Sequence, residues 1–77
     1  MSKNRLYKGS ISYAKLFERM KKKGIKKQTL RDKYKVSTTV ITKLNNNYPI
    51  SGDTIIYLCE ILKCQPGNIM EYVPYKG

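Results

Sequence analysis

The sequence predicts an all-α fold of five short helices in one small domain. Apolar residues recur at helical spacing in several short segments bounded by Ser, Gly or Pro, and no segment alternates as a strand does. A chain of 77 residues, 40% of them hydrophobic, can bury one compact core but leaves little room for an enclosed catalytic cavity. We expect this domain over residues 11–73, between a flexible basic arm (residues 1–10) and a C-terminal tail (residues 74–77).

The first helix is predicted over residues 12–23 and the second over residues 27–34. Ser12 is a suitable N-cap, and Gly24 stands where helices commonly end in a left-handed residue. The apolar residues of the first helix keep the spacing of one buried face: Tyr13, Leu16, Phe17 and Met20.

Three more helices are predicted after the second. Ser37 is a good N-cap for a helix over residues 38–46, and Ser51 caps a fourth helix. Pro66 is placed for the first turn of a fifth helix that runs to about Glu71. The inward stripe of the fourth helix is Ile55, Leu58, Cys59 and Leu62.

The charge of the chain is segregated. Residues 1–43 hold 14 Lys and Arg against two acidic residues, a formal charge of +12, whereas residues 44–77 carry −1, and the whole chain carries +11. Solubility does not require such segregation. It indicates a basic surface that meets a polyanion, and we favour nucleic acid over an anionic membrane surface.

The third predicted helix has an unusual outer face. Val40, Ile41 and Leu44 fall on one arc that must face the core. The other side shows small hydrogen-bonding residues, which are mediocre helix formers but suit the edges of bases in a DNA groove. These outer residues are Thr38, Thr39, Thr42, Lys43 and Asn46.

Several other classes of function are disfavoured. The chain has no His, no carboxylate pair at useful spacing and no glycine-rich phosphate loop, so we expect no enzyme, no metal site, no cofactor and no small-molecule substrate. Cys59 and Cys64 are expected to be small apolar residues of the core. No apolar run approaches a membrane span and no signal peptide is present, so we expect a cytoplasmic protein that does not bind membranes.

The stretch "GIKKQTLRDKYKVSTTVITKL", residues 24–44, resembles the helix-turn-helix of the Xre family, the lambda-repressor-like or Cro-type regulators. The segments "ISY" (residues 11–13) and "LCEILKCQPGNIMEYV" (residues 58–73) are similar to a compact single-domain subgroup of that family. The resemblance implies a lambda-repressor-like DNA-binding domain in which the second and third helices form the helix-turn-helix.

The resemblance also implies roles for single residues. The buried helix-turn-helix positions are Leu30, Val36, Ile41 and Leu44. The resemblance places Thr38, Thr39 and Lys43 at base-reading positions, and the outer face of the third helix adds Thr42. It places Lys27 and Asn46 at phosphate-binding positions, to which the basic charge and the helix start add Lys26, Arg31, Lys33, Lys35 and Ser37. The sequence departs from the family pattern at Arg31, where a small residue is common, and at Lys35, where a turn Gly is common.

These observations predict a sequence-specific regulator that binds double-stranded DNA, with repression as the favoured role. Alternatives are a nonspecific DNA- or RNA-binding module and an antitoxin-type helix-turn-helix protein. Readers of single strands rely on exposed aromatic residues, whereas the tyrosines here are expected mostly on core faces or near the ends of elements. Lys3, Arg5 and Lys8 are candidates for minor-groove contacts or for nonspecific charge.

We also expect a homodimer. One helix-turn-helix reads too few base pairs for specific binding, and such domains usually pair on two half-sites. The nearly neutral C-terminal half offers apolar residues outside the inward stripe of the fourth helix. The predicted dimer residues are Ile56, Tyr57, Ile61, Met70 and Val73.

Overall fold

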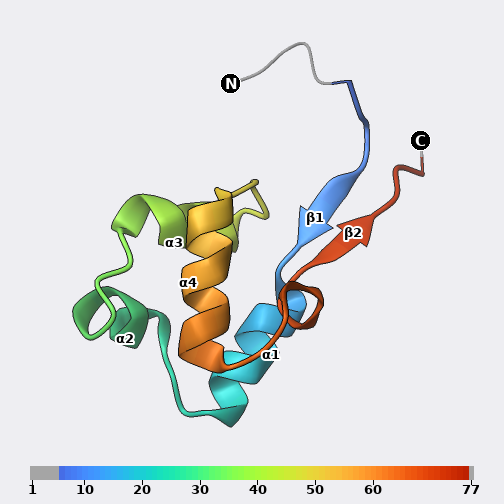
Figure 1. Cartoon of the computed structure of the whole chain (residues 1–77). Helices are drawn as coiled ribbons and strands as arrows, with labels where there is room; N and C mark the ends of the chain where they lie inside the picture. Colours follow the sequence, from blue (N-terminus) through green and yellow to red (C-terminus); the bar gives the residue numbers. More distant parts are fainter. Residues whose placement is uncertain (1–5, 77) are drawn as a thin grey trace.

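The computed structural model describes residues 6–76, and within them four α-helices are joined to a small two-stranded antiparallel sheet (Figure 1). The elements in chain order are β1 (Ser10–Ser12), α1 (Ala14–Lys22), α2 (Lys27–Asp32), α3 (Thr38–Asn45), α4 (Gly52–Leu62), a 3-10 turn η1 (Pro66–Asn68) and β2 (Glu71–Val73). The fold is therefore mostly helical, as predicted, but it is not all-α.

The predicted helix caps explain where three of the helices begin or end. Ser37 Oγ accepts a hydrogen bond from the Val40 N–H at 3.2 Å, and Ser51 Oγ accepts one from Thr54 N–H at 3.2 Å. Each bond satisfies a backbone donor that a helix start leaves without a partner. Gly24, with φ of 71°, ends the segment of α1 in the left-handed conformation.

The core lies between the four helices and the segment that precedes β2. Leu16 and Leu30 are fully buried, as are Leu58 and Leu62 on α4, which confirms much of the predicted apolar spacing. Each such leucine stabilises the fold by about 1.5–3 kcal/mol relative to an exposed one. The buried core consists of Tyr13, Leu16, Met20, Leu30, Val36, Leu44, Leu58, Leu62 and Ile69.

The predicted start of the first helix and the predicted end of the fifth helix are wrong, because the residues at both places form the sheet. Ser12 does not cap a helix at residue 12, because it belongs to β1, and α1 begins at Ala14. The predicted fifth helix is only a single 3-10 turn, after which Glu71 enters β2. The register Ser10–Val73, Ile11–Tyr72 and Ser12–Glu71 joins residues about 60 positions apart, so the pairing overrides the local helix signals.

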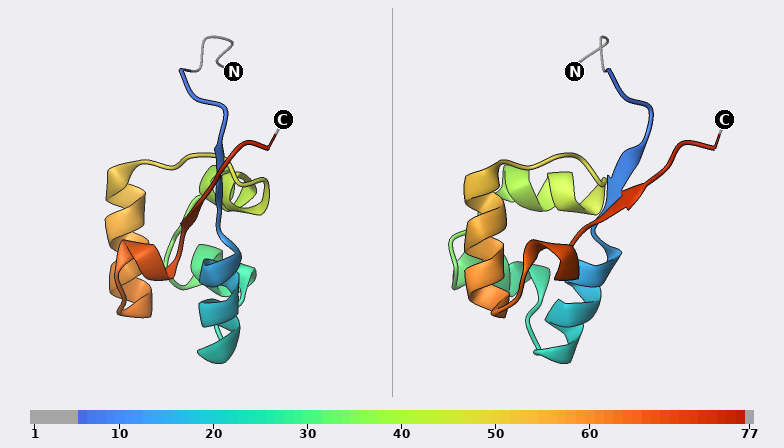
Figure 2. Two further views of the ribbon diagram at one scale, coloured as in Figure 1. Left: turned by 90° about the vertical axis from the view of Figure 1, so that its right-hand side faces the viewer. Right: turned by 45° about the vertical axis from the view of Figure 1, so that its right-hand side comes forward.

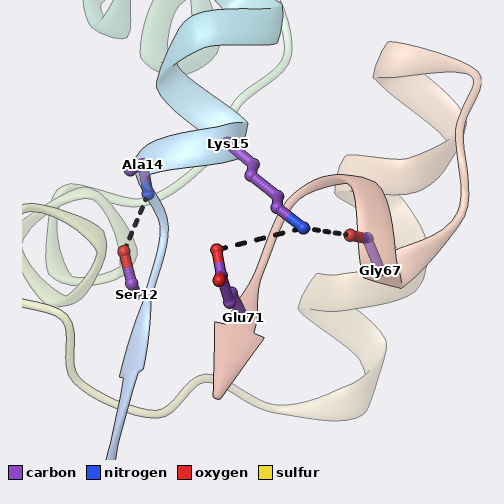
Figure 3. A network of polar contacts seen from close by, with 5 residues as sticks. All are labelled: Ser12, Ala14, Lys15, Gly67 and Glu71. Atoms are coloured by element: carbon purple, nitrogen blue, oxygen red, sulfur yellow. Dashed lines mark hydrogen bonds and ion pairs between the residues drawn. The ribbon is translucent and has the colours of Figure 1, made fainter. Parts of the chain in front are cut away.

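A polar contact between α1 and the C-terminal segment supports the sheet (Figure 3). Lys15 Nζ donates to the Gly67 carbonyl at 3.5 Å and lies 3.9 Å from Glu71 Oε1. Ser12 Oγ accepts from the Ala14 N–H at 3.3 Å, at the point where β1 gives way to α1. These exposed contacts are individually weak, but they place β2 beside the start of α1.

Candidate nucleic-acid interface

The turn between α2 and α3 has the geometry of a helix-turn-helix. Lys35 has a φ of 60°, so it adopts the left-handed conformation in which Gly is common, at a cost of roughly 1 kcal/mol for a residue with a Cβ. Val36 is buried, and its N–H donates to the Leu30 carbonyl at 2.9 Å. From α4, the Tyr57 hydroxyl donates to the Tyr34 carbonyl at 2.6 Å. The turn is thereby fixed from both sides.

The inner face of α3 packs on the core as predicted. Leu44 is buried, and Val40 and Ile41 are partly buried against the same core. With these three residues inward, the rest of the helix must face solvent.

The four predicted base-reading residues gather on that solvent face. Thr38, Thr39, Thr42 and Lys43 are all exposed. Among residues 6–76, no hydrogen bond or ion pair engages the side chains of Thr38, Thr39 or Lys43. The face thus presents hydroxyls and one amine that the fold itself does not use.

The predicted phosphate-binding cations lie in or next to α2 and in the turn that leads to α3, and all are exposed: Lys26, Lys27, Arg31, Lys33 and Lys35. Lys27 Nζ lies 4.7 Å from the centre of the Phe17 ring, and Lys33 Nζ lies 5.4 Å from that of Tyr34. Arg31 points outward, with its Nε 3.4 Å from Asp32 Oδ1. Lysines that rest on aromatic rings keep their stems on the protein and their charge available.

Two further phosphate candidates flank α3. Ser37 is exposed, and because its oxygen only accepts from the Val40 N–H, its own hydroxyl hydrogen is available to donate. At the other end, Asn46 Nδ2 donates to the Thr42 carbonyl at 2.9 Å. An amide nitrogen carries two hydrogens, so one of them is left for a phosphate.

The loop after α3 is held by residues that were not predicted from the sequence. Asn47 is left-handed, with a φ of 57°, and its Oδ1 accepts from the Tyr13 N–H at 3.2 Å. The buried Tyr13 hydroxyl donates to the Tyr48 carbonyl at 2.6 Å. These two bonds fix the end of α3 against the start of α1. The available signal was Asn47 itself, since Asn tolerates the left-handed conformation better than most residues.

The residues predicted for the basic arm and for the dimer interface lie outside the helix-turn-helix. Lys3 and Arg5 fall outside the described residues, whereas Lys8 Nζ lies 5.6 Å from the centre of the Tyr75 ring in the C-terminal segment. The five predicted dimer residues differ in exposure: Ile56, Tyr57 and Val73 are exposed, whereas Ile61 and Met70 are partly buried. On α4, Ile56 is 59% exposed, but Ile61 packs partly on the core, as does Met70. The last two are Tyr57, which binds the Tyr34 carbonyl, and Val73, which lies in β2.

The expectation about the tyrosines needs correction. Tyr13 is the one buried tyrosine, and Tyr34 lies just after α2 as expected. Most of the others are largely exposed, which removes the reason for discounting aromatic contacts: Tyr7, Tyr48, Tyr72 and Tyr75.

Cys59 and Cys64 are free thiols that pack partly on the core, so they act as apolar residues in this fold. The Cys64 N–H donates to the Cys59 carbonyl at 3.1 Å across the left-handed Lys63, which ends α4 in a Schellman-type turn. Burial, together with the neighbouring Cys64 thiol, raises the pKa of Cys59.

Within the described residues, no helix combines the length and apolar character that crossing a bilayer requires.

Two helices joined by a tight turn, with exposed cations on the first helix and in the turn and a polar outer face on the second, define a helix-turn-helix domain of the DNA-binding class. The chain belongs to the Cro/C1-type HTH DNA-binding domain family, which matches residues 15–75. It is similar to the crystal structure of the transcriptional regulator VanUg, form II, with 32% identity and a TM-score of 0.82. That similarity covers 96% of this chain and 100% of the other. No curated protein matches the chain.

Proposed function

We propose that the protein is a sequence-specific regulator that binds double-stranded DNA and represses transcription. The observation that carries the proposal is the outer face of α3, where exposed hydroxyls and one amine are left unused by the fold. The name of the similar structure, a transcriptional regulator, supports the regulatory part of the proposal.

In this proposal α3 enters the major groove, with its N-terminal residues toward the bases. Thr38, Thr39 and Thr42 hydrogen bond to base edges or pack on thymine methyl groups, and Lys43 donates to guanine acceptors. Lys26, Lys27 and the other cations around α3 hold the phosphates on either side and fix the register of the helix. Lys3 and Arg5 extend the contact into a neighbouring minor groove.

A homodimer is part of the same proposal. The eight residues of α3 reach only a few base pairs, whereas specific binding among many competing sites needs more. Two copies on half-sites about one helical turn apart would double the contacts and match the symmetry of an inverted repeat.

The test compares two affinities for each variant. Thr39→Ala and Lys43→Ala should each cost about 1–3 kcal/mol on the preferred duplex and much less on random duplex DNA. Lys63→Ala, a matched lysine after α4 and outside the proposed face, should leave both affinities unchanged. Circular dichroism must show that each variant is folded. Equal losses of affinity for preferred and random DNA would show that Thr39 and Lys43 contact the DNA backbone and not the bases.

A further inference from the structure

The exposed apolar residues of the protein are concentrated on one structure, the terminal ribbon, which we define as residues 6–12 and 71–76. Of the eight exposed large hydrophobic residues in the described chain, five belong to the ribbon and one more, Tyr48, lies beside it. By contrast, α4 carries only two, Ile56 and Tyr57. The five on the ribbon are Leu6, Tyr7, Tyr72, Val73 and Tyr75.

The ribbon extends beyond the helices (Figures 1 and 2). Within residues 6–76 its sheet has two strands of three residues each, so in this part of the chain each strand has an outer edge with no neighbouring strand. Two-stranded ribbons are marginally stable in water, and open apolar edges invite pairing with another chain.

One face of the ribbon is hollowed into a tyrosine pocket of about 240 Å³. Ile11 and Tyr72, which are partners in the register of the sheet, both line this pocket, and Tyr7 and Gly9 join them from the segment that precedes β1. The lining contains no charged side chain. It consists of Tyr7, Gly9, Ser10, Ile11, Asn47, Tyr48, Pro49 and Tyr72.

Gly9 is required by the shape of this pocket. It is buried, and a Cβ at this position would lie 2.6 Å from Tyr72 Cε1 and 2.9 Å from the Val73 carbonyl oxygen. The Tyr72 ring therefore lies close over the backbone of Gly9, which a larger residue would prevent. The position of Tyr72 is thus built into the fold, although the residue is 71% exposed.

We propose that the terminal ribbon is the homodimer interface and that the tyrosine pocket of each copy contacts the ribbon of the other around a two-fold axis. Charge favours a second copy as the occupant. Residues 6–12 and 71–76 carry Lys8, Lys76 and Glu71, a formal charge of +1, whereas residues 13–43 carry 11 Lys and Arg against two acidic residues, or +9. Two ribbons can approach without the repulsion that two helical halves would meet.

The location also fits DNA reading. Asn47, Tyr48 and Pro49 follow α3 directly, so a dimer formed at this pocket directs the C-terminal ends of the two α3 helices toward the axis. Thr38 and Thr39, at the opposite end of α3, stay clear of the interface. The interface deepens the proposed function, because it supplies the homodimer on which that function depends.

The test is the mass of the full chain in solution by light scattering at tens of micromolar protein. The wild type should show twice the chain mass of 9.0 kDa. Tyr72→Lys should return it to monomer, because an altered residue counts twice in a two-fold interface and self-association should weaken on the order of 100-fold or more. Tyr48→Lys is a second disrupting variant in case Tyr72→Lys does not fold. Ile56→Lys, at a similarly exposed position on α4, should remain dimeric.

Two results would overturn the interface: a wild type that is monomeric at every concentration, or a dimer that Ile56→Lys disrupts and both tyrosine variants leave intact. The result is separable from the proposed function. A dimer disrupted by Tyr72→Lys but without preference for any DNA sequence would retain the interface and refute the function. A sequence-specific monomer would refute the interface and the homodimer, but it would retain the reading of DNA by α3.

Discussion

The Tyr13 hydroxyl offers the sharpest test of how the fold holds α3. Tyr13 is fully buried, and its hydroxyl donates at 2.6 Å to the Tyr48 carbonyl in the loop after α3. Tyr13→Phe removes this one bond and leaves the packing of the ring unchanged. Because Tyr48 is exposed, water can solvate the freed carbonyl, so we expect a loss of about 1 kcal/mol in the free energy of unfolding. For a domain of this size that corresponds to a fall of about 4–8 °C in Tm.

Urea unfolding followed by circular dichroism measures this loss, and Tyr48→Phe is the matched control, because it removes an exposed hydroxyl from the same loop. The control should stay within about 0.5 kcal/mol of the wild type. A Tyr13→Phe variant as stable as the wild type would show that the bond does not hold the loop.

The same variant has a pH signature. Burial raises the pKa of Tyr13 in the folded chain, whereas in the unfolded chain the phenol titrates near its ordinary value of about 10. The stability contributed by the neutral phenol is therefore present below about pH 10 and is lost as the pH rises toward the folded pKa. Phe cannot ionise, so the advantage of the wild type over Tyr13→Phe should shrink between pH 8 and pH 11. An advantage that is constant over this range would contradict the raised pKa.

Two further predictions concern charge and thiols. If about six Lys and Arg contact phosphates, the logarithm of the DNA-binding constant should fall with log salt at a slope of roughly −5. Lys27→Ala should weaken binding to all sequences and make this slope less steep by about 1. A slope near zero in a salt titration would refute the proposed phosphate contacts. Because the pKa of Cys59 is raised and both cysteines are partly buried, iodoacetamide at pH 8 should alkylate them several-fold more slowly in the folded chain than in urea, as followed by mass spectrometry. Equal rates in the two conditions would contradict the packing described for α4.

The parts of the fold that sequence could predict are those set by local interactions. Ser37 and Ser51 cap the helices that follow them because a serine oxygen can satisfy a backbone donor three residues later. The left-handed Lys35 follows from the turn that the family resemblance implies, even though Lys is a poor residue for that conformation. The apolar spacing of α1 and α3 indicated which of their faces would be buried.

The sheet could not be predicted for a physical reason. Strands of three residues are too short to show alternation, and their stability depends on pairing between residues about 60 positions apart. Once residues 10–12 and 71–73 pair as strands, the first helix cannot start at Ser12, and the fifth helix cannot extend to Glu71. The exposure of Tyr7 and Tyr72 follows from the same pairing, because it carries both residues away from the core.

For the DNA-binding face, the sequence indicated which residues of α3 would be exposed, because Val40, Ile41 and Leu44 leave only one other side. It did not indicate the loop contacts of Asn47 and Tyr13, since those depend on how α1 packs against the end of α3. On α4, the predicted dimer residues were chosen by helical spacing. That spacing cannot show that Tyr57 reaches the Tyr34 carbonyl or that Ile61 packs partly on the core.

Selection of bound duplexes from a random-sequence pool by the full chain tests whether α3 reads the sequence of double-stranded DNA. We expect enrichment of an inverted repeat whose half-sites are centred about 10 base pairs, or one helical turn, apart. Lys43→Ala should bind the same pool with a relaxed preference at one position of each half-site. A pool that binds without enrichment of any sequence, or a chain that prefers single strands to duplexes, would contradict the claim.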